Sequence, residues 1–128
     1  IAVSNFNQLK AKGPKQAGGI KMNQAIFVRE NHSFHKILLE EIVFIESEEN
    51  YVKVHLTNGK RMMVRSTFSD FLEQLPTEQF FRSGRSHAVQ LNMIDKIDPT
   101  EIHISGHKVP LSRTNKEELY ERLGIKSN

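Results

Sequence analysis

The sequence feature that most restricts the fold is a β-hairpin pattern in residues 51–65. Polar and apolar side chains alternate from Tyr51 to Leu56, which predicts a strand with one face toward a core. Asn58-Gly59 suits the positive backbone angles of a tight turn, and residues 61–65 are predicted to form the returning strand. Paired across this turn, the two strands would carry a mixed basic and aromatic surface. The alternative is an ordinary solvated sheet face.

Further strands and two short helices are predicted around this hairpin. Apolar runs bounded by turn residues indicate strands at 26–30, 34–39, 42–45, 88–91, 93–97 and 101–105. The helices are expected at 67–75 and 114–123. Ser66 or Thr67 can cap the first helix, and Asp70, three residues after Thr67, would supply the acid of a capping box. Thr114 and Glu117 form the capping box of the second helix. The pattern is that of a mainly β protein.

The segment Phe80–Asn92 combines core anchors with a polar turn. Phe80 and Phe81 are large apolar residues, of which at least one should be buried. Between them and the next strand, residues 82–87 supply arginines and hydroxyl groups, and Gly84 allows a sharp turn. Such donors on a loop held at both ends suit recognition of an anion or a base edge. An ordinary solvated hairpin loop is the alternative.

Length and composition favour one globular domain with a preceding linker. A chain of 128 residues, 38% of them hydrophobic, can bury a core. Residues 1–24 lack sustained periodicity, so we predict a linker from an upstream domain, followed by one domain over 25–128. Because the chain starts at Ile1, we expect a longer protein. The absence of cysteine excludes disulfides and agrees with a reducing compartment. No apolar run approaches the roughly 18 residues of a membrane span.

The net charge of +3 is unevenly distributed. Residues 1–25 hold four lysines and no acid, whereas residues 26–128 hold fourteen basic and fifteen acidic groups. Bulk charge of the globular part therefore does not argue for nucleic acid. The local distribution is more informative, because five glutamates crowd residues 40–49 and residues 102–116 carry bases without any acid.

Catalytic and metal-binding patterns are weak. Six histidines are present, but the pairs His32/His35 and His103/His107 fall on predicted strands and turns, where these spacings do not converge on one ion. Ser86 and His87 are sequence neighbours and would point to opposite faces. A phosphate-cradling glycine motif is missing as well. We therefore expect no metal, no cofactor and no enzyme activity.

The order of the motifs resembles that of a known family. The segments are Glu40–Ser47, Asn50–Leu56, Arg65–Phe68, Leu72–Pro76, Phe80–Asn92, Ile94–Ile97 and Val109–Arg113. This series resembles the LytTR-type DNA-binding domain of bacterial transcriptional regulators, over roughly Ile26 to Leu123. The resemblance implies an elongated three-sheet β fold with two short helices. It also implies sequence-specific binding of double-stranded DNA by the output domain of a two-component response regulator in the bacterial cytoplasm.

The resemblance also implies particular site residues and partners. Its base-reading positions fall on Asn50, Arg85 and Arg113. The expected DNA-backbone contacts are Tyr51, Lys53, Arg65, Ser86, Lys108 and Ser112. Such domains typically follow a receiver domain and bind repeated half-sites as two copies. For Arg82 the alternative is a pairing with a nearby carboxylate on the sheet.

Several residues in or beside the reading loop depart from the family pattern. The family usually has an aliphatic residue at the position of Ser83 and His or Asn at that of Gly84. It usually has an aromatic residue at the position of His87 and Asn at that of Gln90. These departures leave the fold prediction intact and bear on the base preference. They also keep open a second function, a protein–protein interaction module on the same fold. Salt dependence separates the two functions, because DNA binding must weaken as salt rises.

Overall fold

The computed structural model of the chain describes residues 24–126. The strands are β1 (Ala25–Glu30), β2 (Ser33–Leu38), β3 (Ile42–Glu48), β4 (Tyr51–Leu56), β5 (Arg61–Arg65), β6 (Phe80–Arg82), β7 (His87–Gln90), β8 (Ile94–Ile97), β9 (Glu101–Ile104) and β10 (His107–Pro110). The α-helices are α2 (Phe68–Glu73) and α3 (Arg113–Leu123), and 3-10 turns form η2 (Leu39–Glu41) and η3 (Leu91–Met93). The expected linker, residues 1–24, lies almost wholly outside the described residues.

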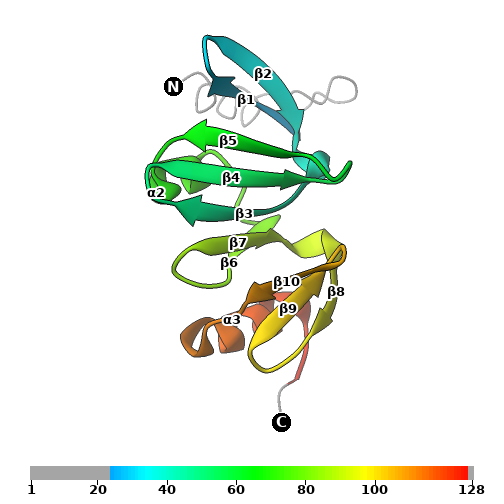
Figure 1. Ribbon diagram of the computed structural model, residues 1–128. Helices are drawn as coiled ribbons and strands as arrows, with labels where there is room; N and C mark the ends of the chain where they lie inside the picture. Colours follow the sequence, from blue (N-terminus) through cyan, green and yellow to red (C-terminus); the bar gives the residue numbers. More distant parts are fainter. Residues whose placement is uncertain (1–23, 127–128) are drawn as a thin grey trace.

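The strands form three antiparallel sheets that follow one another along the molecule (Figure 1). β1 and β2 form the first sheet, and the second has the order β5-β4-β3-β7-β6. The third sheet has the order β10-β9-β8 and lies beside α3 at the C-terminal end. The prediction of a mainly β, elongated three-sheet fold with two short helices is confirmed. In the part of the chain that the structure describes, none of the helices is long and apolar enough to cross a membrane.

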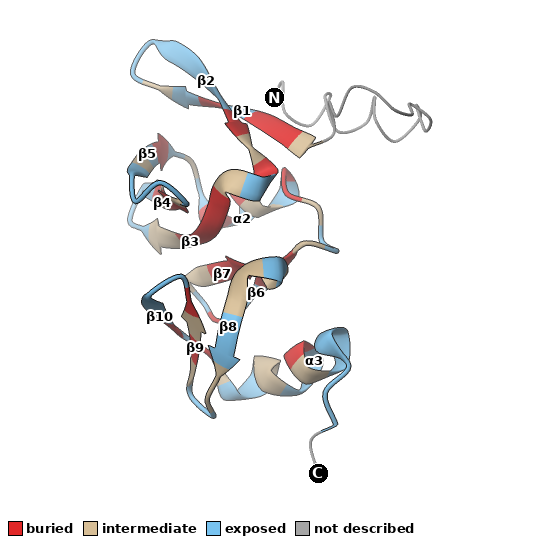
Figure 2. Cartoon of the chain, turned by 90° about the vertical axis from the view of Figure 1, so that its right-hand side faces the viewer, coloured by how far each residue is buried: buried red, intermediate tan, exposed pale blue. Residues whose placement is uncertain are grey.

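The central five-stranded sheet is covered on both faces. One cluster of buried side chains joins it to β1, β2 and α2, and a second joins it to the third sheet and α3. Phe80 and Phe81 are both buried, and because neighbouring residues of a strand face opposite ways they belong to different clusters. Residues 42–45 of β3 are all buried, as an unbroken apolar run predicts. Figure 2 shows the buried segments of β1, β3 and β7 between the exposed ends of the molecule.

The turns and helix starts are mostly those that the sequence predicts. The chain turns between β4 and β5 at the predicted place, where the Gly59 amide donates to the Leu56 carbonyl at 3.0 Å. Gly59 has the expected positive φ, 85°, whereas Asn58 does not have a positive φ. Thr67 caps α2 by accepting a hydrogen bond from the Asp70 amide at 3.0 Å. The predicted second cap is wrong. Ser112, two residues before Thr114, accepts from the Asn115 amide and begins the helix earlier.

Candidate nucleic-acid interface

Three connections between elements gather on one long edge of the molecule. They are the β3–β4 turn, the β6–β7 loop and the β10–α3 junction, all on the left-hand side of Figure 1. Each carries one of the base-reading candidates, Asn50, Arg85 and Arg113 respectively, and all three side chains are exposed. The fold thus brings residues that are far apart in sequence to one edge, which we call the loop edge.

Backbone hydrogen bonds tie these connections together. The Ser47 amide at the end of β3 donates to the Ser86 carbonyl at 2.8 Å. The Ser112 amide at the start of α3 donates to the Ser83 carbonyl at 2.7 Å, and the Asn115 side chain donates to the Arg82 carbonyl at 3.2 Å. The β6–β7 loop is therefore fixed to β3 on one side and to α3 on the other. This arrangement holds Arg85 and Arg113 in a defined relation.

The Arg82 side chain stabilises the same loop through hydrogen bonds to its backbone. Its Nε donates to the Gly84 carbonyl at 3.0 Å and its Nη2 to the Arg85 carbonyl at 2.9 Å. Its guanidinium also lies 4.9 Å from the centroid of the Phe68 ring. Within residues 24–126, Arg82 therefore contacts backbone carbonyls and an aromatic ring and forms no ion pair with a carboxylate, so the alternative of a carboxylate pairing is wrong. Its role is to shape the loop that presents Arg85.

The departures from the family pattern are mostly buried. Ser83 is fully buried, Gly84 is also buried, and Gln90 is 2% exposed. Gln90 donates from Nε2 to the carbonyls of Leu39 and Ile42, at 2.8 and 2.9 Å. Ser83 and Gly84 can therefore affect recognition through the shape of the loop, and Gln90 through the packing of β7 against the 3-10 turn before β3.

Gly84 does not need to be glycine for conformational reasons. Its φ is not positive, and a Cβ there would meet only the Pro110 carbonyl oxygen, at 3.9 Å. The expectation that Gly84 enables a sharp turn is therefore not supported by its backbone angles. The loop is shaped instead by the amides of Ser83 and Gly84, which both donate to the His87 carbonyl.

The predicted backbone-contact residues occupy several positions relative to the loop edge. Arg65 pairs with Tyr51 across β4 and β5, and its guanidinium lies 5.9 Å from the Tyr51 ring centroid. Lys53 lies farther along β4, with its Nζ 3.4 Å from a carboxylate oxygen of Glu48. Ser86 belongs to the β6–β7 loop beside Arg85. All four come from segments that reach the edge.

The other two candidates have additional constraints. The Ser112 hydroxyl is used in capping α3, where it also lies 3.1 Å from the Thr114 hydroxyl. Lys108 is exposed on β10 opposite His103, on the outer face of the third sheet. Lys108 therefore projects from a sheet face, unlike the base-reading candidates Asn50, Arg85 and Arg113, which lie on the three connections of the loop edge.

One histidine on the predicted solvent face of the hairpin is buried. His55 is 8% exposed because Phe44 stacks on it at 4.0 Å between ring centroids and His107 of β10 packs against it at 5.4 Å. Its Nε2 lies 2.8 Å from Glu46 Oε1. The other oxygen of Glu46 lies 3.7 Å from Nε2 of His87, the first residue of β7 after the reading loop.

These contacts shift the pKa values of all three groups. Burial is the largest influence on the pKa of His55 and lowers it, as do the charges of His107 and Lys53; the hydrogen bond and charge of Glu46 raise it, and the net shift is downward. Burial likewise lowers the pKa of His87, against the opposing effect of Glu46. Burial raises the pKa of Glu46, but the hydrogen bond with His55 and nearby positive charge together lower it by more, so the net shift is downward. Near neutral pH the cluster therefore holds one carboxylate between two neutral imidazoles.

Acidification should destabilise the fold through this cluster. The unfolded chain takes up protons at His55 and His87 near their ordinary pKa of 6.5, before the folded protein does. The contribution of these two histidines to the free energy of unfolding should therefore be complete above about pH 6.5 and be lost as pH falls below it. Glu46 adds a loss of the same sign as pH falls below its ordinary value of 4.5. Urea unfolding across this range measures the effect.

A matched pair of variants assigns this pH dependence. His87→Gln should make the stability of the protein depend less on pH between about pH 7 and 5. His32→Gln, which replaces an exposed imidazole in the β1–β2 turn, serves as the control substitution. An unchanged pH profile for His87→Gln would show that His87 does not contribute.

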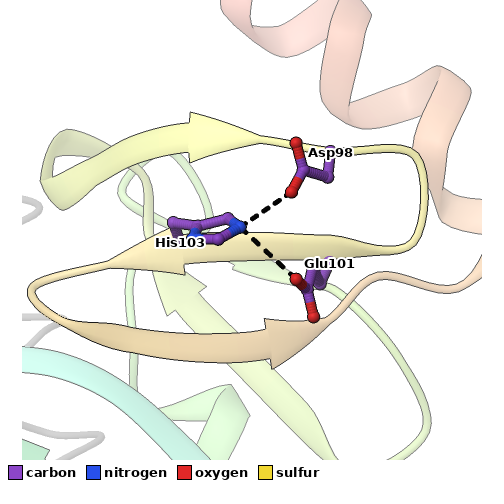
Figure 3. Close-up of side chains that lie close together, drawn as sticks. All are labelled: Asp98, Glu101 and His103. Carbon is purple, nitrogen blue, oxygen red and sulfur yellow. Dashed lines mark hydrogen bonds and ion pairs between the residues drawn. The ribbon is translucent and has the colours of Figure 1, made fainter.

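A second cluster of ionisable side chains lies on the third sheet (Figure 3). His103 Nε2 is 2.8 Å from Asp98 Oδ2 and 3.4 Å from Glu101 Oε2. One ligand atom from each residue lies within 4.8 Å of the others, so the group has the ligand types and closeness that a divalent cation needs. Sequence reasoning considered only the histidine pairs and missed it. The Asp98–Glu101 turn between β8 and β9 is what brings the three residues together.

Comparison with known proteins gives consistent matches. Residues 32–124 match the LytTr DNA-binding domain family. An uncharacterized response regulatory protein of Vibrio cholerae is 28% identical over 124 residues, covering 88% of this chain and 48% of that protein. The sensory transduction protein LytT of Enterococcus faecalis is 26% identical over 120 residues, covering 89% and 46%. The chain spans about half the length of these curated relatives.

Among solved structures, the LytTr DNA-binding domain of a Bacillus cereus response regulator has a similar fold. The TM-score is 0.68 at 19% sequence identity, and the match covers 80% of this chain and 98% of that one. At this identity the likeness concerns the fold.

Proposed function

Because this chain belongs to the LytTr DNA-binding domain family, we propose that its loop edge reads a specific sequence in double-stranded DNA to regulate transcription. The observation that carries this proposal is the gathering of Asn50, Arg85 and Arg113 on three connections of one edge, all exposed. The hydrogen bonds of the β6–β7 loop to β3 and to α3 support it, since base readout needs donors held in place.

The side chains suit distinct roles at the DNA. A guanidinium can donate two parallel hydrogen bonds to guanine N7 and O6, which fits Arg85 and Arg113. The amide of Asn50 matches the N6 and N7 edge of adenine. The expected phosphate contacts are Tyr51, Lys53, Arg65, Ser86, Lys108 and Ser112. These position the domain on the duplex without specifying its sequence.

The same proposal extends to the whole protein. The two curated relatives are named as a response regulatory protein and a sensory transduction protein, each about twice as long as the matched region. We place a receiver domain upstream of residues 1–24, which act as the linker, and the complete protein in the cytoplasm. Two copies bind repeated half-sites, with one copy at each half-site.

Selection from a pool of random duplexes tests the proposal. One sequence, or a repeated pair of sequences, should be enriched, and its binding should weaken steeply as salt rises. Three of the six expected phosphate contacts, Lys53, Arg65 and Lys108, are charged, and they predict a slope of log K against log salt on the order of −3 per bound copy. Fluorescence anisotropy on the enriched duplex measures this slope. Binding without enrichment would contradict base readout, and no salt-dependent binding at all would favour the protein–protein interaction module.

A further inference from the structure

An open hollow of about 640 Å³ lies between the first and second sheets, next to the loop edge. Its lining comes from the end of β1, the β1–β2 turn, β4 and β5, and consists of Arg29, Glu30, Asn31, His32, Tyr51, Met63 and Arg65. Tyr51 is the neighbour in sequence of Asn50, whose carbonyl accepts a hydrogen bond from the Ser66 amide at 3.2 Å. The hollow is therefore continuous with the end of the loop edge that carries Asn50.

Two guanidinium groups flank this hollow, and each lies over an aromatic ring. The Cζ of Arg29 is 5.7 Å from the centroid of Phe34, and the Cζ of Arg65 is 5.9 Å from that of Tyr51. Such contacts restrain a guanidinium without neutralising its charge or occupying all its donors. Both arginines are exposed, so these donors face solvent.

The balance of charge in the hollow is positive. Glu30 is the one carboxylate in the lining, and the two arginines outweigh it. Glu30 also lies 3.7 Å from Nε2 of His35. Asn31 and His32 add polar side chains from the turn, where Asn31 has a positive φ of 61°. An open, net positive hollow with forked donors on two sides suits a phosphate group.

We propose that this hollow seats a phosphate of the DNA backbone between Arg29 and Arg65, so that the β1–β2 turn forms an additional part of the interface. This inference rests on the proposed DNA binding. It adds Arg29 and the turn residues Asn31 and His32, which the sequence analysis did not assign to the DNA interface. The hollow joins residues that lie more than twenty positions apart in the chain, and β1 lies against β5 only in the folded protein.

The test compares two arginines that carry the same charge at opposite edges. Arg29→Ala should weaken binding to specific and unrelated duplexes alike, by about fivefold at 0.15 M salt, and flatten the salt slope by about 0.9. Arg61→Ala removes the same charge beside the β4–β5 turn, on the right-hand side of Figure 1. It should change affinity less than about twofold, since a charge at that distance is screened.

Two further variants separate charge from packing. Arg29→Lys keeps the positive charge but not the planar stacking on Phe34, so it should retain most of the affinity and the slope. Glu30→Gln removes the carboxylate from the hollow and should tighten binding to both duplexes. Thermal melting of each variant checks that the 128-residue chain is folded before the titration.

The outcomes are distinguishable. If Arg29→Ala behaves like Arg61→Ala while Arg85→Ala loses specificity, the inference is wrong and the proposed function stands. If the unmodified chain binds no duplex, both fail. Titration with inorganic phosphate at constant ionic strength provides the last arm. The hollow would be a free-anion site if phosphate shifts the NMR signals of Arg29 and Arg65 saturably while Arg29→Ala leaves DNA binding unchanged. That result would overturn its assignment to the DNA backbone.

Discussion

Arg85→Ala should cost roughly 1–3 kcal/mol of binding free energy at the preferred duplex and clearly less at an unrelated one. The side chain is exposed on the β6–β7 loop, and the loop is fixed by Arg82 and by the amides of Ser47 and Ser112. If Arg85 contacts a base edge as proposed, little loop entropy is lost on binding, because the loop is already held in place. Titration of both duplexes at two salt concentrations measures the two losses separately.

Other variants give the pattern that this result should be compared with. Arg113→Ala should show the same preference for loss at the specific duplex, because it too is proposed to contact a base. Lys53→Ala should weaken both duplexes by a similar factor and flatten the salt slope by up to about one unit. Because the Lys53 Nζ lies 3.4 Å from a carboxylate oxygen of Glu48, part of its charge is already compensated, and the change in salt slope should be smaller than one unit. Equal losses on both duplexes for Arg85→Ala would show that Arg85 contacts only phosphate.

Local sequence signals predicted the elements of this fold well. The alternation in residues 51–56 and the Asn58-Gly59 turn act over a few residues, and β4 and β5 form as they indicate. Thr67 likewise begins α2 by accepting a hydrogen bond from a close neighbour, the Asp70 amide. These features were predictable because each depends on the backbone conformation of one short segment.

Features that depend on packing between distant segments were not predictable in the same way. His55 alternates with apolar residues and was placed on the solvent face, yet β10 and Phe44 cover it. The helix cap at Ser112 is favoured by the hydrogen bond of its amide to Ser83, a contact between β6–β7 and α3. Arg82 carries a charge, but its partners are carbonyls that the loop brings within reach.

The candidate site divides along the same line. Family resemblance supplied Asn50, Arg85 and Arg113, and the structure adds that their three connections lie on one edge. The hollow between Arg29 and Arg65 and the Asp98–Glu101–His103 cluster have no sequence signature, because strands that are separated in the chain or joined by a turn assemble them. Burial also changes how the departures from the family are understood, since Ser83 and Gln90 lie inside the protein.

Gln90→Ala should destabilise the protein by about 2–4 kcal/mol, the largest stability effect expected from a polar residue here. The Gln90 side chain is 2% exposed and donates to the carbonyls of Leu39 and Ile42, which joins β7 to the 3-10 turn before β3. Alanine removes both hydrogen bonds and leaves a cavity at the centre of the molecule. Urea unfolding monitored by circular dichroism measures the loss.

Two substitutions at the same position separate the causes of this loss. Gln90→Met nearly preserves the side-chain volume, so its cost reports the two lost donors without most of the cavity. Gln90→Glu places a carboxylate against two carbonyl oxygens, and should cost at least as much as alanine near neutral pH. Its cost should shrink toward acid pH, because the protonated acid can donate one hydrogen bond. Asn92→Ala, an exposed change two residues away, is the control. If Gln90→Ala proves as mild as Asn92→Ala, the two buried hydrogen bonds do not hold β7 against the turn, and the central sheet must be fixed by its apolar contacts alone.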